Sequence, residues 1–141
     1  MWSSPANPTP QLNTVLVWYK AVSSWDIAAL TTLLSENYVH HTLPASANDP
    51  PKNKTEGLAH ARKMGEIFGN KPMNYEIYDV NEAEGKIWVH SKLSIEVPSG
   101  PSFNNESIFI FTIDPATPGE IAIIKEFVDT KMMHDMKSGS G

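Results

Sequence analysis

The sequence contains no cysteine, which excludes disulfide bonds, thiolate catalysis and zinc sites built on cysteine. It has no apolar run near the roughly 20 residues that span a bilayer, and its polar, proline-rich start does not resemble a secretory signal. Its 11 lysines and arginines are scattered and its net charge is -5, so no phosphate-binding surface is expected. We therefore expect a cytoplasmic protein with neither a nucleic-acid partner nor a membrane partner.

Sequence motifs for cofactors and metals are also missing. There is no glycine-rich nucleotide loop, no Gly-x-Ser-x-Gly and no His-x-x-x-His. His60, His90 and His134 are isolated from one another, and two neighbouring histidines on a strand point to opposite sides. The sequence therefore predicts neither a cofactor nor a metal site.

The length and composition are those of one globular domain. With 141 residues, of which 40% are hydrophobic, the chain can bury a sizeable core. We assign residues 10–136 to a single domain. Residues 1–9 are expected to be a flexible N-terminus, and residues 137–141 a flexible tail or an expression scar.

The first half of the chain has helical periodicity. Thr9 and Pro10 predict a helix start, and Ser23 with Asp26 predicts a second one. A third helix is expected from Thr55 to about residue 68. Between the second and third helices, residues 38–42 are aromatic and β-branched enough for a short strand, which an extended loop follows.

From residue 73 the period changes to two. Strands are predicted at 74–80, 86–97, 103–113 and 120–128, with a short terminal helix at 130–136. The turns between these strands, including one at 98–101, are short, so neighbouring strands should pair antiparallel. Three helices followed by such strands predict an α+β fold shaped like a cone, in which a strongly curved antiparallel sheet wraps around the three N-terminal helices.

One strand is apolar on both of its faces. Ile108 and Ile110 alternate with Phe109 and Phe111, so both sides of the sheet need a cover. The helices cover one side. We predict that a second copy of the chain covers the other, which gives a homodimer through the sheet face.

Three segments resemble the nuclear transport factor 2-like superfamily, in particular its SnoaL-like and ketosteroid-isomerase-like members. They are Tyr-Val-His-His-Thr-Leu-Pro (38–44) with residues 54–57, residues 104–111, and residues 119–121 with 126–129. The resemblance spans Leu12 to Met133 and is greatest to SnoaL-like proteins of filamentous fungi. It implies a cup-shaped α+β barrel with a pocket. Such a fold hosts isomerases, cyclases, dehydratases, epoxide hydrolases and binding modules.

The histidine pair is the first candidate site. His40 and His41 face opposite sides of their strand, so only one of them can point into the cup. The resemblance places His41 where ketosteroid isomerases carry their aspartate base, and a neutral imidazole can serve as a base near neutral pH. We therefore take His41 as catalytic and His40 as ligand-binding. The alternative is a histidine that is hydrogen-bonded at the rim of the core.

Two acidic residues near the end of the domain are the next candidates. The resemblance places Glu126 at an acidic position that serves acid-base catalysis in related epoxide hydrolases. The alternative is a Glu126 that points outward and pairs with Lys125 or Lys92. Asp129 matches an acidic SnoaL-like position and is a ligand-binding candidate, although capping the terminal helix is the preferred role.

The long strands contribute the remaining candidates. One of Asn105 and Glu106 should point inward, as an oxyanion donor or as a further catalytic carboxylate, unless this strand end is solvated. Trp88 and His90 line either the cup or the dimer face. Trp18 belongs to the core or rim, or stacks on a ligand.

Three functions fit this sequence. The first is a cofactor-free isomerase, cyclase or dehydratase, in which His41 and Glu126 shuttle a proton on an apolar polyketide- or terpenoid-like molecule. The second is a non-catalytic binding protein for such a small apolar molecule, and the third is an interaction module that uses its sheet. Ionisable groups that converge in one pocket favour the enzyme, a purely aromatic lining favours binding, and a filled cup favours the interaction module.

Overall fold

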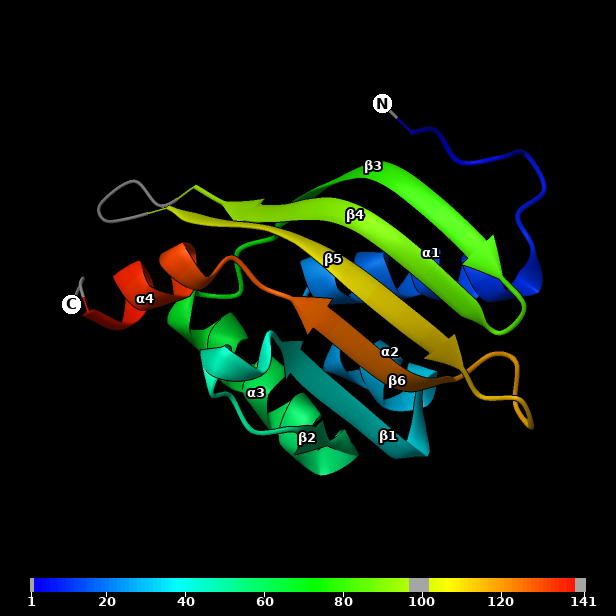
Figure 1. Cartoon of the computed structure of the whole chain (residues 1–141), viewed down its shortest axis with the longest axis horizontal. Helices are drawn as coiled ribbons and strands as arrows, with labels where there is room; N and C mark the ends of the chain where they lie inside the picture. Colours follow the sequence, from blue (N-terminus) through cyan, green and yellow to red (C-terminus); the bar gives the residue numbers. More distant parts are fainter. Residues whose placement is uncertain (1, 97–101, 139–141) are drawn as a thin grey trace.

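The computed structural model describes residues 2–96 and 102–138 of the 141-residue chain. The turn expected at 98–101 and residues 139–141 of the tail lie outside the described residues. Figure 1 shows the elements, which follow in the order α1 (Pro10–Ser23), α2 (Ile27–Leu33), β1 (Leu34–Leu43), the 3-10 turn η1 (Ala45–Ala47), β2 (Lys52–Asn53), α3 (Lys54–Ile67), β3 (Asn74–Ala83), β4 (Lys86–Ile95), β5 (Phe103–Ile113), β6 (Ile121–Phe127) and α4 (Thr130–Ser138).

Hydrogen-bonded caps fix where the first two helices begin. Thr9 Oγ1 accepts a hydrogen bond from Leu12 N (3.1 Å), so α1 begins where it was predicted to begin. The second helix begins later than predicted, because its cap is Asp26, which accepts from Ala29 N at 3.0 Å. Ser23 instead donates back to a carbonyl of α1.

A complete capping box, with Asn53 as the N-cap, fixes where the third helix begins. Asn53 Oδ1 accepts from Glu56 N (2.9 Å), and Glu56 Oε1 accepts from Asn53 N (3.0 Å). The predicted cap, Thr55, is therefore already inside the helix. The earlier start leaves room only for the two-residue strand β2 between the proline loop and α3.

The six strands form one curved, open sheet in the order β2-β1-β6-β5-β4-β3. Neighbouring strands from β3 to β6 pair antiparallel, as the short turns predicted. The prediction of a wholly antiparallel sheet is wrong, because β1 pairs with β6 in parallel and the sheet is mixed. Helix α3 and four strands, β2 to β5, separate β1 from β6 in the chain, so no short turn dictates their relative direction.

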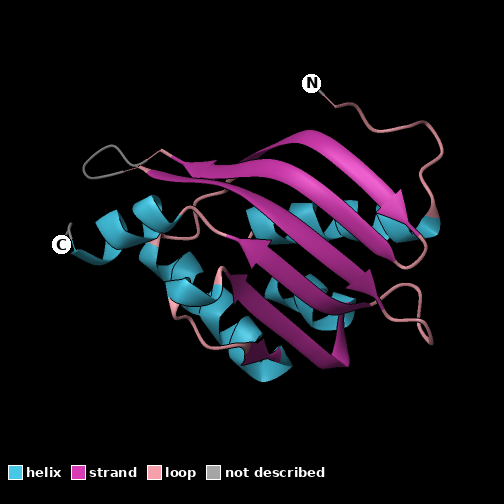
Figure 2. Cartoon of the chain, in the orientation of Figure 1, coloured by secondary structure: helices cyan, strands magenta, loops and turns pink. Residues whose placement is uncertain are grey.

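Helices α1, α2 and α3 lie against one face of the sheet, which we call the inner face (Figure 2). The core lies between these two layers. Its side chains that are almost fully buried are Val15, Tyr19, Ile87, Val89, Ile95, Phe111, Ile121 and Ile124. The α+β class and the curved sheet around N-terminal helices are confirmed. None of the helices in the described part of the chain is long and apolar enough to cross a bilayer.

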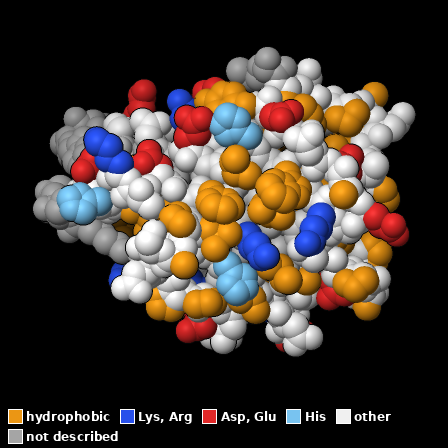
Figure 3. Space-filling model, in the orientation of Figure 1, with side chains coloured by type: hydrophobic (Ala, Val, Ile, Leu, Met, Phe, Trp, Pro, Cys, Tyr) orange, Lys and Arg blue, Asp and Glu red, His pale blue; other side chains and the backbone are white. Residues whose placement is uncertain are grey.

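The opposite, outer face of the sheet is apolar too. In β5, which lies between β4 and β6, Phe109 and Phe111 are buried on the inner face, while Ile108 is 40% exposed. Ile108 lies opposite Phe127 in the β5–β6 ladder, and Phe127 is 44% exposed. Trp88 in β4 is 48% exposed as well, and Figure 3 shows hydrophobic side chains gathered near the centre of one face of the molecule.

Candidate functional site

A cavity of about 520 Å³ lies between the helices and the inner face of the sheet. This volume is in the range of small-molecule sites. Its walls are mainly apolar, and six aromatic residues contribute to them: Trp18, Trp25, Tyr38, Phe68, Phe103 and Phe109. Four methionines complete much of the remaining wall: Met64, Met73, Met132 and Met133. Unbranched methionine side chains adapt to irregular shapes, so this wall suits a bulky apolar ligand.

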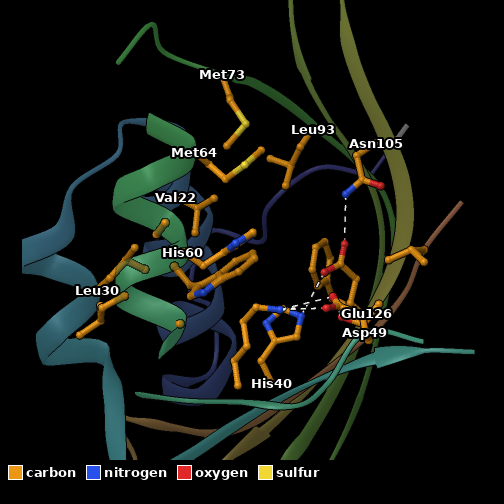
Figure 4. A pocket seen from close by; sticks show the side chains of 18 of the residues that line it. Val22, Leu30, His40, Asp49, His60, Met64, Met73, Leu93, Asn105 and Glu126 are labelled. Atoms are coloured by element: carbon orange, nitrogen blue, oxygen red, sulfur yellow. Dashed lines mark hydrogen bonds and ion pairs between the residues drawn. The ribbon is translucent and has the colours of Figure 1, made fainter. Parts of the chain in front are cut away.

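Polar side chains meet at the sheet side of the cavity (Figure 4). His40 Nε2 lies 3.1 Å from Glu126 Oε1, and the two side chains are 22% and 15% exposed. Asn105 Nδ2 donates to the other carboxylate oxygen, Glu126 Oε2, at 3.1 Å. Three strands, β1, β6 and β5, thus hold one carboxylate between an imidazole and an amide.

In the hydrogen bond between Asn105 and Glu126, the amide is the donor and the carboxylate is the acceptor. Asn105 is 7% exposed, and its Oδ1 has no hydrogen-bond partner among the described residues. The reverse amide orientation would place two acceptor oxygens, Asn105 Oδ1 and Glu126 Oε2, against each other. Asn105 therefore serves as a donor that fixes the Glu126 carboxylate.

Tyr38 extends this chain of polar groups. Its hydroxyl lies 3.3 Å from His40 Nδ1. Burial raises the pKa of Tyr38, and the Glu126 charge raises it further, so the hydroxyl keeps its proton and can donate to Nδ1. With Tyr38 as donor, His40 is the tautomer that carries its proton on Nε2 and donates to Glu126. The hydrogen bonds thus run from Tyr38 to His40 and from His40 to Glu126.

A second polar group lies on the same wall. Lys52 Nζ lies 3.2 and 3.3 Å from the two carboxylate oxygens of Asp49. Thr42 Oγ1 donates to Asp49 Oδ2 at 3.0 Å. All three line the cavity. The cavity therefore has two polar groups, one around Glu126 and one around Lys52.

His60 faces these groups from helix α3 (Figure 4). His60 is exposed to solvent and also contributes to the cavity lining, so it lies at the cavity mouth. Partial burial lowers the pKa of His60, and the nearby Lys52 ammonium and His40 lower it further. The imidazole of His60 is therefore neutral over most of the physiological pH range.

The expectation that His41 points into the cup is wrong, because the inward histidine is His40. Tyr38 is 4% exposed on the inner face, and side chains alternate along a strand, so residues 38, 40 and 42 face inward. His41 does not line the cavity and instead lines a second, smaller pocket with the prolines of the following loop. A register shift between Leu34 and Val39 in the β1–β6 ladder sets this alternation, and the sequence pattern does not reveal it.

The strand candidates divide between the two faces. Asn105 and Glu126 line the cavity. Glu106, expected as a possible catalytic carboxylate, faces outward, and its Oε2 lies 2.7 Å from His90 Nε2. Trp88 is 48% exposed on the outer face. Glu106, His90 and Trp88 therefore lie away from the cavity, since adjacent strand residues alternate and the inner positions are Ile87, Val89, Ser91, Asn105 and Ser107.

The remaining two candidates have mainly structural contacts. Asp129 accepts a hydrogen bond from Met132 N at 3.1 Å, so it caps α4 and does not line the cavity. Trp18 is 6% exposed, makes edge-to-face contacts with Phe109 and Phe111, and also lines the cavity.

Sequence reasoning missed Tyr38, Thr42, Asp49, Lys52 and His60. Tyr38 and Thr42 lie on the same face of β1 as His40, because side chains alternate along a strand. A prediction that His40 points inward would therefore have identified both. Lys52 lies directly opposite His40 in the β1–β2 ladder. No pattern predicts a two-residue strand after a proline loop, so Lys52 becomes visible only in the fold.

No group of three or more His, Cys, Asp or Glu side chains within residues 2–96 and 102–138 is arranged to hold a metal ion.

The fold is that of nuclear transport factor 2-like proteins, as the resemblance implied. The BvnE pinacolase from Penicillium brevicompactum is similar to it with a TM-score of 0.76 at 16% identity, over 91% of this chain and 92% of that chain. PrhC from Penicillium brasilianum is similar with a TM-score of 0.74 at 22% identity, over 91% and 87%. An NTF2-like protein of unknown function from Cytophaga hutchinsonii has a TM-score of 0.66 at 13% identity, over 92% and 99%.

No protein-family model matches the sequence. No curated protein matches it either. At these identities the structural similarities establish the fold and not the reaction.

Proposed function

We propose that this protein is an enzyme that transfers protons on a bulky, apolar, polyketide- or terpenoid-like molecule, by acid-base chemistry that its own side chains supply. The observation that carries the proposal is the His40–Glu126 pair, 3.1 Å apart, at one end of an otherwise apolar cavity. An isomerisation, a cyclisation or a dehydration is the expected reaction class. The BvnE pinacolase among the fold neighbours supports an enzyme over a passive carrier.

Glu126 is the group that moves the proton. Its two oxygens each accept one hydrogen bond, from His40 and from Asn105, and a carboxylate has further lone pairs for a ligand proton. Glu126 takes a proton from a ligand carbon, and the C–H electron pair forms a C=C bond while the π pair of a neighbouring carbonyl moves onto its oxygen. In an isomerisation that oxygen pair returns to re-form the carbonyl, and the proton is delivered to another carbon. In a dehydration the C–O bond of a hydroxyl group breaks, and the proton from Glu126 leaves with that hydroxyl as water.

His40 and Tyr38 are positioning residues in this scheme. His40 donates to Glu126 Oε1, and Tyr38 donates to His40 Nδ1, so the orientation of the carboxylate is fixed before a ligand arrives. The aromatic and methionine walls exclude water, which strengthens these interactions because the local dielectric is low.

The test is the Kemp elimination of 5-nitrobenzisoxazole, a small aromatic compound whose ring opens when a base removes one C–H proton. The N–O bond breaks and a coloured nitrophenolate is released, so absorbance follows the rate. We expect saturable turnover by the wild type, and kcat/KM lower by about 100-fold or more in Glu126→Gln, as for the loss of a general base.

The matched control is Glu106→Gln on the outer face, since Glu106 also pairs with a histidine. We expect it to leave the rate unchanged. Equal rates for the wild type and Glu126→Gln would refute the catalytic proposal. Saturable binding of the compound without turnover would favour the alternative, a non-catalytic small-molecule binding protein.

We also propose that a second copy of the chain covers the outer face of the sheet. Trp88, Ile108 and Phe127 are 48%, 40% and 44% exposed on three adjacent strands, and monomers seldom expose a continuous apolar surface of this kind. Sedimentation velocity should find a dimer that Ile108→Lys dissociates. Val17→Lys is the matched control, because Val17 is 41% exposed on helix α1. A wild-type monomer at all concentrations would refute the dimer.

A further inference from the structure

The cavity contains a lysine next to the His40–Glu126 pair. Lys52 lies opposite His40 in the antiparallel β1–β2 ladder, so the two side chains project from the same face of the sheet. Thr42, which bonds to the partner of Lys52, lies opposite Glu126 in the β1–β6 ladder. The backbone register thus places the ammonium group and the catalytic carboxylate on neighbouring positions of one wall.

Asp49, which also accepts a hydrogen bond from Thr42, holds this lysine in place. Lys52 Nζ contacts both oxygens of Asp49, at 3.2 and 3.3 Å, and the two side chains are only 24% and 28% exposed. An ammonium group has three N–H donors, and a carboxylate on one side of it uses at most two of them. At least one donor of Lys52 is therefore left for a ligand.

Lys52 is the only lysine or arginine among the described residues that line the cavity. Its charge acts on the cavity mouth, where it contributes to the lowered pKa of His60 on the facing helix. Two carboxylates, Glu126 and Asp49, line the same region. With one fixed cation against two acidic groups, the cavity disfavours an anionic ligand and accepts a neutral one with a hydrogen-bond acceptor.

We infer that Lys52 binds the carbonyl oxygen of the substrate, which is a ketone or another neutral carbonyl compound with a C–H bond next to the carbonyl. This inference rests on the proposed function and names its substrate class. Glu126 removes the proton beside the carbonyl, the C–H electron pair becomes a C=C bond, and the C=O π pair moves to oxygen. The enolate oxygen so formed accepts a hydrogen bond from Lys52, which is stronger in the transition state than in the ground state.

The experiment compares two probes of one shape. 2-Acetylnaphthalene has a carbonyl group where 2-ethylnaphthalene has a methylene group. By isothermal titration calorimetry we expect the wild type to bind the ketone about tenfold more tightly, which is the effect of one charge-assisted hydrogen bond. In Lys52→Met this preference should vanish, while the Kd of 2-ethylnaphthalene stays within about twofold, which also shows that the cavity is intact.

Two further variants make the comparison decisive. Lys52→Arg keeps a cationic donor and should retain a preference for the ketone, and Lys20→Met on the exposed surface of α1 should behave as the wild type. A ketone preference that persists in Lys52→Met would overturn the inference, and so would a wild type that does not distinguish the two probes.

Exchange of the acetyl protons in D2O separates this inference from the proposed function. NMR should detect exchange catalysed by the wild type, slower exchange with Lys52→Met, and none above background with Glu126→Gln, whose affinity for the ketone is retained. If Glu126→Gln exchanges protons as the wild type does, the role of Glu126 fails while the Lys52 contact stands. If only the Lys52 variant retains the wild-type rate and affinity, the Lys52 contact fails while the role of Glu126 stands.

Discussion

Both faces of the sheet carry a histidine paired with a glutamate, and the surroundings of the two pairs differ. On the inner face, His40 and Glu126 are 3.1 Å apart and 22% and 15% exposed. On the outer face, His90 and Glu106 are closer, at 2.7 Å, but 41% and 59% exposed. The shorter contact is the one that water surrounds.

The difference shows that the environment and not the distance makes a His–Glu pair a candidate site. Water screens the outer pair, and exposed pairs of this kind contribute little. The inner pair has Tyr38 and Asn105 as additional partners and faces an apolar cavity. There each hydrogen bond is stronger, because the local dielectric is low.

The largest expected effect is on the free energy of unfolding, and it should differ between buried side chains of the inner face and exposed ones of the outer face. Phe111 is 0% exposed on the inner face, and Phe127 is 44% exposed on the outer face. Phe111→Ala should lower the free energy of unfolding by about 3–5 kcal/mol, because it leaves a cavity in the core. Phe127→Ala should cost about 1 kcal/mol or less in the monomer. Urea unfolding at low protein concentration measures both, and equal losses would contradict the assignment of the faces.

A smaller effect on kcat/KM is expected from substituting the tyrosine beside the inner histidine, and none from substituting the tyrosine beside the outer one. Tyr38 hydrogen-bonds to His40, whereas the ring of Tyr78 lies 4.9 Å from that of His90. Tyr38→Phe should lower kcat/KM in the Kemp elimination by about fivefold, the effect of one hydrogen bond in a positioning chain. Tyr78→Phe is the control and should leave the rate unchanged. A larger loss with Tyr78→Phe would refute the position of the site.

The smallest effect concerns the protonation of His60. Its pKa should lie below the usual histidine value and should rise when Lys52→Met removes the nearby charge. Because the folded state binds this proton less readily than the unfolded state, stability contributed by neutral His60 falls as the pH drops through the usual histidine range. Titration of the ring signals by NMR measures the shift. A pKa unchanged by Lys52→Met would show that the two groups do not interact.

Local patterns predicted most of the elements. The bounds of β5, Phe103–Ile113, follow from a run rich in aromatic and β-branched residues between two predicted turns, and the start of α1 follows from Thr9 and Pro10. The later start of α2 and the earlier start of α3 depend on which of two nearby polar residues forms the cap, and the sequence offers both choices.

The candidate site could be predicted only in part. Glu126 was a candidate because of the family resemblance, and Asn105 because one of two adjacent polar residues in an apolar strand should point inward. The choice between His40 and His41 depended on which face of β1 each residue occupies, and a register shift in β1 sets this. The parallel pairing of β1 with β6 and the position of Lys52 depend on contacts between segments far apart in the chain. Such contacts leave no periodic trace in the sequence.

The polar groups of the cavity and the side chains that determine its shape come from different parts of the fold. The groups proposed to do chemistry, Glu126, His40, Asn105 and Lys52, all project from strands whose backbone ladders fix them. Much of the wall that determines ligand shape comes from helices, including Met64 on α3 and Met132 and Met133 on α4. Substitutions in these helices can therefore change the accepted ligand while the reacting groups stay in place. The shape of the cavity can thus diverge during evolution while the polar side chains on the strands are kept.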